Sequence, residues 1–168
     1  MSLRQPMSAR GFTMIEMLVV VCVIGILVAI ALPGYRGYVE RTNRTVGKAA
    51  LSTLAARQES YAADHKVYTA NFSRLGVSGT GTATTAFLDR QGNLSLASSS
   101  SALYQLAVHD TATGAATCTG LGTGAIRFTY VLVATPVNTR TDQRCGTLCL
   151  SSSGQRGATG GTENCWGK

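Results

Sequence analysis

The chain has 168 residues, 15 Lys and Arg against 8 Asp and Glu, and a formal net charge of +7. An apolar segment near the N-terminus inflates the hydrophobic fraction, which is 45%. The remainder is rich in Ser, Thr and Gly, as is typical of extracytoplasmic strands and loops and not of a large enzyme core. About 130 residues remain for a globular part, the ordinary size of one domain. The mildly basic charge permits contact with DNA or anionic surfaces without establishing it.

A basic leader precedes an apolar segment of membrane length. Residues 1–10 contain Arg4 and Arg10 and no acid, which favours a cytoplasmic position. Residues 12–32, at about 1.5 Å per residue of helix, can cross a hydrocarbon core of roughly 30 Å. A secretory signal peptide would end in a small-residue cleavage site, whereas Leu32 is followed by Pro, Gly and Tyr. Any cleavage is therefore expected on the cytoplasmic side.

The boundary between leader and apolar segment carries Gly11, Phe12, Thr13 and Glu16. This pattern resembles the class III signal of type IV pilins, in which a prepilin peptidase cuts after the glycine and N-methylates the next residue, here Phe12. The resemblance implies three segments: a leader peptide at 1–11, a transmembrane and assembly helix at 12–34, and an amphipathic helix with a periplasmic globular domain at 35–168.

The same resemblance implies a location and a set of partners. The chain would be held in the inner membrane of a Gram-negative bacterium by one span and would then enter an extracellular pilus filament. Its partners would be the prepilin peptidase, other pilin subunits and the pilus assembly platform in the inner membrane.

Glu16 is a carboxylate within the membrane-length segment. An ionised carboxylate there costs roughly 2.5 kcal/mol or more unless it finds a partner. Near the interface it could simply reach water or take up a proton. The resemblance implies instead that Glu16 pairs with the freed amine of Phe12, its own or a neighbour's, and so sets the axial register of helices in the filament.

The apolar helix is interrupted by Pro33, which removes one backbone hydrogen bond. Gly25 and Pro33 bracket a segment that can lose helicity, and similar pilins stretch there in filaments. From residue 35 to about 64 the pattern is amphipathic. The predicted apolar face consists of Val39, Val46, Ala50, Leu54 and Tyr61, and the opposite face of Arg36, Arg41, Arg44, Lys48 and Arg57.

Strand patterns follow the helix. Residues 68–101 are loop-like, except that 84–88 could form a short strand, and stronger strand patterns cover 103–108, 126–133 and 147–150. The second of these alternates, with Ile126, Phe128, Tyr130 and Leu132 on one face. We therefore predict an α+β fold of the type IV pilin kind, with a long N-terminal helix packed on an antiparallel β-sheet. The tail from Gly154 to Lys168 is too rich in glycine to be stable alone.

The five cysteines fall into two groups. Cys22 lies in the apolar run and behaves as a small hydrophobic residue. Cys118, Cys145, Cys149 and Cys165 lie in the exported part, where an even number favours two disulfides. A zinc site of four thiolates is the alternative. From spacing alone, three disulfide connectivities remain open.

The C-terminal region resembles minor pilins of the PilE type. The matching segments are Ala134-Thr135-Pro136, Asp142-Gln143-Arg144-Cys145-Gly146, Leu148-Cys149-Leu150 and Cys165-Trp166. The resemblance implies a bond between Cys145 and Cys165, which leaves Cys118 for Cys149. Cys149 departs from the family pattern, which has another residue there.

These features predict a minor pilin of a type IV pilus that supports pilus biogenesis, twitching motility and adhesion. One alternative is a pseudopilin of type II secretion, but only Asp142 and Glu163 supply carboxylates for a calcium loop near the C-terminus. The other alternative is a DNA-binding receptor pilin for natural transformation. Its candidate contacts are Arg127, Arg140, Arg144, Arg156 and Lys168, with Trp166 available for stacking.

Catalytic patterns are weak, and we predict no enzymatic activity, cofactor or metal. Residues 120–124 lack the glycine spacing of a dinucleotide loop. His65 and His109 stand apart from any nucleophile motif. Function is therefore expected to come from assembly and from the exposed surface.

Overall fold

The computed structural model describes residues 12–110, 118, 121, 130–138, 141–161 and 165–167. The chain divides into two compact units, Met1–Tyr38 and Val39–Lys168. One helix, α1 (Met14–His65), contributes its first part to the first unit and its second part to the second unit. Residues 25–33 are helical in this structure, so the loss of helicity in a filament stays a prediction.

In the first unit, α1 exposes apolar side chains along its whole length. Of the large hydrophobic residues that are exposed in the described part of the chain, all but Val67 and Val137 lie between Phe12 and Tyr38. By length and composition this part of the helix can cross a membrane.

The second unit contains one antiparallel sheet with strand order β2-β1-β3-β4-β5-β6. The strands are β1 (Thr85–Leu88), β2 (Leu94–Ser95), β3 (Tyr104–Asp110), β4 (Tyr130–Pro136), β5 (Leu148–Ser151) and β6 (Arg156–Ala158). The central pair, β3 and β4, is in register from Tyr104 opposite Pro136 to Asp110 opposite Tyr130.

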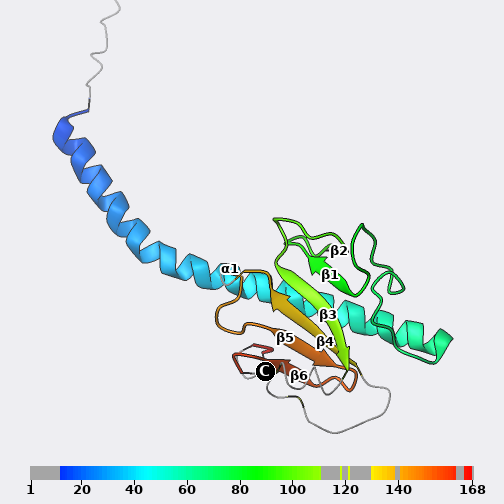
Figure 1. The fold of residues 1–168 in the computed structure, drawn as a ribbon. Helices are drawn as coiled ribbons and strands as arrows, with labels where there is room; N and C mark the ends of the chain where they lie inside the picture. The colour runs from blue at the N-terminus through cyan, green and yellow to red at the C-terminus, as the bar shows by residue number, and fades with distance from the viewer. Residues whose placement is uncertain are drawn as a thin grey trace, which may run out of the picture. The chain divides into compact units, whose positions relative to one another are not determined.

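The second part of α1 packs on this sheet (Figure 1). Leu51 and Leu54 of the helix are fully buried in one cluster with Leu88, Leu106 and Leu132 of the sheet. The predicted apolar face is correct for Ala50 and Leu54, which are buried, and for Val46 and Tyr61, which pack against the cluster. The prediction omitted Leu51. Steps of seven and four residues select only the positions along the centre of the buried helix face.

Both faces of the central strand β4 are covered, which the sequence pattern did not predict. Tyr130 and Leu132 join the cluster beneath the helix, whereas Val131 and Val133 form a second cluster with Cys118 and Cys149. The alternating pattern was therefore correct for the helix-facing side and incomplete for the other. Residues 126–129, the first half of the predicted strand, lie outside the described residues.

Two short strands were missed. The hairpin partner of β1 is β2, where Leu94 lies opposite Leu88. At the other edge, β6 pairs with β5 and places Ala158 opposite Leu148, so part of the tail predicted to be unstable alone is held by the sheet. Gly146 precedes β5 with φ +60°, a backbone conformation that favours glycine. A Cβ atom there would also meet the hydroxyl of Thr159.

Candidate functional site

The N-terminus of α1 carries the residues predicted to act in processing and assembly. Phe12 is 80% exposed, and Gly11 lies outside the described residues. The hydroxyl of Thr13 accepts a hydrogen bond from the Glu16 amide at 3.3 Å, and the Glu16 carboxylate accepts one from the Thr13 amide at 3.5 Å. This reciprocal pair is a capping box, which satisfies free amides at the start of a helix. Glu16 is exposed, so its carboxylate remains accessible to a second subunit.

At the other end of the chain, Asp142 anchors the segment before β5 to α1 and the sheet. Its carboxylate forms a two-pronged ion pair with Arg44, with both nitrogen-oxygen distances 2.8 Å. It also accepts hydrogen bonds from the Cys145 amide at 3.0 Å and from the Tyr104 hydroxyl at 3.4 Å. The hydrogen bond to Asp142 raises the pKa of Arg44. Arg44, which the sequence pattern placed opposite the predicted apolar face, is nevertheless buried, because a partner 98 residues away neutralises its guanidinium.

The ion pair also bears on the alternative of a calcium-binding pseudopilin. Asp142 uses its carboxylate for Arg44, and Glu163 lies outside the described residues. Within the described part of the chain, no group of three His, Cys, Asp or Glu side chains could hold a metal ion.

Two disulfides tie the C-terminal third together. Cys145 is bonded to Cys165, and Cys118 is bonded to Cys149, which is the pairing that the resemblance implied. The four cysteines are thus not arranged as a zinc site. Cys22 is free and exposed. The first bond holds the segment with Trp166 against the core cluster, and the second lies in the cluster on the other face of the sheet.

A basic surface lies beside the Cys145–Cys165 bond. Arg144 and Arg156 are exposed, and the Arg156 guanidinium and the Lys48 ammonium lie 5.6 and 5.8 Å from the centre of the Trp166 ring. Burial, and then the charges of Arg44 and Arg156, lower the pKa of Lys48. Sequence analysis missed Lys48 as part of this surface. The other predicted contacts, Arg127, Arg140 and Lys168, lie outside the described residues.

Trp166, which was predicted to be available for stacking, is only partly exposed in the structure. The indole is half-buried, packs against the core cluster, and has two cations over its ring. Its Nε1 donates a hydrogen bond of 2.8 Å to the Gly157 carbonyl. A nucleic-acid base that stacked on this ring would compete with the two cations for it.

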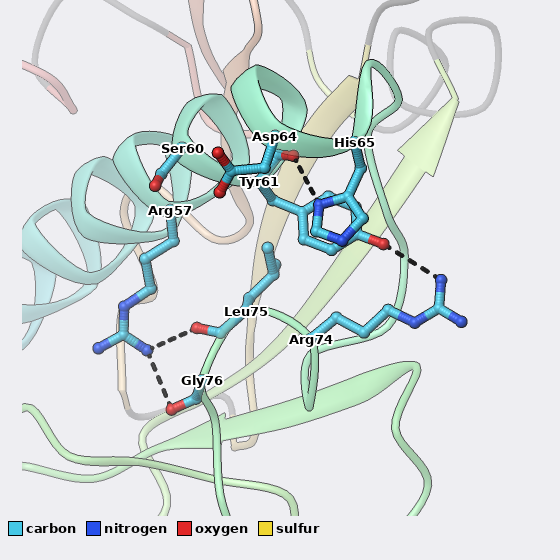
Figure 2. Close-up of a pocket in the computed structure, with 8 residues that line it drawn as sticks. All are labelled: Arg57, Ser60, Tyr61, Asp64, His65, Arg74, Leu75 and Gly76. Atoms are coloured by element: carbon cyan, nitrogen blue, oxygen red, sulfur yellow. Dashed lines mark hydrogen bonds between the residues drawn. The ribbon is translucent and has the colours of Figure 1, made fainter.

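A pocket of about 860 Å³ lies between the end of α1 and the loop that follows it. Figure 2 shows its two guanidinium groups on opposite sides of the Leu75 side chain. Arg57 donates to the carbonyl of Leu75 at 3.0 Å, and Arg74 donates to the Tyr61 hydroxyl at 3.2 Å. His65, one of the two isolated histidines, stacks on Tyr61. These cations hold the loop to the helix and do not converge on one point, so the pocket is not a compact anion site.

An apolar helical segment that continues into a helix packed on an antiparallel sheet, with a disulfide-bonded C-terminal segment, is the α+β fold of type IV pilins. Residues 33–149 match the family described as "Type IV minor pilin ComP, DNA uptake sequence receptor", and residues 6–32 match the prokaryotic N-terminal methylation motif. The chain belongs to this family of type IV minor pilins.

Individual relatives match mainly over part of the chain. The type IV wide pilus major component PilA4 of Thermus thermophilus is 40% identical over 68 residues, which cover 40% of this chain and 52% of that protein. A fimbrial protein of Pseudomonas aeruginosa is 45% identical over 53 residues, covering 32% and 34%. The type IV major pilin PilA of Myxococcus xanthus is 36% identical over 67 residues, covering 40% and 30%. The chain thus spans about half or less of the length of these relatives.

Proposed function

We propose that this minor pilin is cut between Gly11 and Phe12 by a prepilin peptidase, N-methylated on Phe12, and moved from the inner membrane into a type IV pilus by the assembly platform. The observation that carries this proposal is the run of exposed apolar side chains from Phe12 to Tyr38. A surface of this kind needs either lipid or the helices of other subunits around it. The pilus would then serve twitching motility and adhesion.

Mass spectrometry of the pilin from purified pili tests the processing step. We expect the first residue to be N-methyl-Phe12. A chain that retains Met1 in cells with active prepilin peptidase would contradict the proposal.

Glu16 has two possible roles during assembly, and matched variants separate them. If its charge pairs with the amine of Phe12, Glu16→Gln blocks incorporation, because the amide keeps the capping-box acceptor but not the charge. If the capping box alone matters, Glu16→Gln assembles normally and Thr13→Ala fails. We expect Glu16→Gln to be cleaved but absent from pili, and Thr13→Ala to be incorporated.

A second function, capture of DNA at the pilus surface, is favoured by the match to a family described as a DNA uptake sequence receptor. The exposed Arg144 and Arg156 and the half-buried Lys48 would contact the phosphate backbone. Sequence preference would require additional contacts to base edges.

Selection from a random duplex pool tests this second function. The full-length pilin in a non-ionic detergent is incubated with the pool at about 150 mM salt, where purely electrostatic binding is weak. A receptor enriches one sequence, and we expect Arg144→Gln to reduce that enrichment, whereas the exposed Arg90→Gln leaves it unchanged. Uniform recovery of all sequences would show that the basic surface contacts DNA without sequence preference.

A further inference from the structure

Three elements meet at the ring of Trp166. Lys48 comes from α1, Arg156 from β6, and Trp166 follows the Cys145–Cys165 bond. A cation over an indole face is held by the ring quadrupole, so the ring can keep two side chains in place that would otherwise be mobile. The indole itself is fixed by its hydrogen bond to the Gly157 carbonyl.

Neither cation forms a salt bridge in the described part of the chain, and Asp142, the carboxylate whose charge acts on Lys48, is bonded to Arg44. Nearby Arg44, in contrast, is neutralised by Asp142. Burial, and then the charges of Arg44 and Arg156, lower the pKa of Lys48. The effect of the two charges is the one expected where positive charge is in excess. An anion bound by Lys48 and Arg156 would offset this excess of positive charge.

We propose that Lys48 and Arg156 form a phosphate-binding site, and that Trp166 is a positioning residue that holds the two cations and does not stack on bases. This inference rests on the DNA capture proposed above and assigns its backbone contact. The ligand group is a phosphodiester of duplex DNA: an Arg guanidinium presents two parallel N–H donors to phosphate oxygens, and a Lys ammonium adds a point charge. Contacts of this type set affinity and position and carry no sequence information.

The salt dependence of binding tests the two cations. Duplex DNA is titrated into the full-length pilin in a non-ionic detergent at several salt concentrations. Each phosphate contact contributes about 0.9 to the slope of log affinity against log salt. This slope is negative, because affinity falls as salt rises. We expect Lys48→Gln and Arg156→Gln each to make it less steep by about that amount. Lys66→Gln and Arg90→Gln, at exposed positions elsewhere, should leave it unchanged. Unchanged slopes in Lys48→Gln and Arg156→Gln would overturn the site.

The role of Trp166 is tested by its own fluorescence, because it is the one tryptophan in the chain. A positioning role predicts little quenching by either duplex or single-stranded DNA. It also predicts that Trp166→Leu lowers the affinity for duplex roughly 5-fold, as the loss of cation–π contacts requires, and that Trp166→Phe restores most of it. Strong quenching by single-stranded DNA would show that bases stack on the indole and would overturn this role.

Tripolyphosphate separates this inference from the proposed function. If the pilin binds tripolyphosphate in a way that Lys48→Gln and Arg156→Gln abolish, the phosphate site stands even where DNA binding is absent and the DNA function fails. If the pilin binds DNA but the two variants bind tripolyphosphate as the wild type does, the function stands and the site is wrong. Tighter binding of poly-glutamate than of tripolyphosphate through the same two cations would assign the site to an acidic protein and would also overturn the proposal.

Discussion

At the scale of single residues, Asp142 links three separate parts of the globular unit. Its carboxylate is fully buried and joins Arg44 of α1, Tyr104 of β3 and the Cys145 amide. Removal of this one side chain leaves a buried guanidinium without its counter-charge. The loss of stability therefore comes mainly from the buried charge of Arg44 that remains.

We expect Asp142→Ala to lower the free energy of unfolding by about 3–5 kcal/mol, the range for loss of one partner of a buried ion pair. Urea unfolding of the full chain in a non-ionic detergent measures this. The control is Asp64→Ala, which removes an exposed carboxylate from α1, the helix that carries Arg44, and should change little. The double variant Arg44→Met with Asp142→Leu should recover much of the loss, and a double variant as unstable as Asp142→Ala would contradict this account.

Two tyrosines, Tyr104 and Tyr130, make the stability of the globular unit, Val39–Lys168, depend on alkaline pH. Burial and the charge of Asp142 raise the pKa of Tyr104, and burial and the charge of Glu59 raise the pKa of Tyr130, from an ordinary value of 10.0. Because the folded state favours the neutral phenols, this contribution to stability is complete below pH 10 and is lost as the pH rises toward the folded pKa.

The unfolding midpoint in urea should therefore fall as the pH is raised above about 10. Tyr130→Phe cannot ionise, so it should show a smaller fall, whereas Tyr35→Phe, at an exposed position outside the globular unit, should follow the wild type. An identical alkaline fall in Tyr130→Phe and wild type would remove Tyr130 from this explanation.

At the scale of secondary-structure elements, α1 lies close to β3 at Gly47. A Cβ atom on Gly47 would lie 3.0 Å from Cε2 of the Tyr104 ring. That ring is fully buried and its hydroxyl is bonded to Asp142, so it has little freedom to move aside. We expect Gly47→Val to destabilise the unit by about 1–3 kcal/mol through overpacking.

Gly37→Val is the matched control, because nothing lies within 4 Å of a Cβ at that position of the same helix. Thermal unfolding followed by circular dichroism compares the two variants. Equal midpoints would show that the helix and the sheet adjust to the added side chain.

Sequence periodicity predicted the strands that are long enough to show a strand pattern in their own residues. The segments 103–108 and 147–150 correspond to β3 and β5, and 84–88 to β1. The strands β2 and β6 have two and three residues, too few for a period of two to be recognised. They exist because a neighbouring strand supplies hydrogen-bond partners, which is information that a local pattern does not contain.

The same limit explains the functional residues that sequence reasoning missed. Arg44 precedes the buried Leu51 by seven residues and Leu54 by ten, a spacing that places all three on one helix face. This spacing could have indicated burial, but the partner Asp142 is 98 residues away. Lys48 was likewise assigned only to the face opposite the apolar one. Its contact with Trp166 could not be predicted, because Trp166 is held in place by the Cys145–Cys165 bond.

At the scale of the whole molecule, the two units differ in what makes them stable. The unit Val39–Lys168 buries its own core, whereas the described part of Met1–Tyr38 leaves its apolar side chains exposed. The conformation of the first unit is therefore expected to depend on what surrounds it, which is lipid before assembly and other subunits in the filament. Residues 25–33 are the part in which this change would be visible, since Gly25 weakens the helix and Pro33 has no amide to bond the Ala29 carbonyl.

Amide hydrogen exchange of the pilin in detergent and in assembled pili tests this expectation. In detergent we expect protection throughout 14–32, because the helix is continuous there and an unsatisfied backbone group is costly in an apolar medium. In pili we expect faster exchange at 25–32 than at 14–24, while residues 48–58 stay protected in both samples because Leu51 and Leu54 are buried in the core. The double variant Gly25→Ala with Pro33→Ala raises helix propensity at both sites and should slow exchange at 25–32 in pili. Equal protection of 14–24 and 25–32 in wild-type pili would show that the helix enters the filament unchanged.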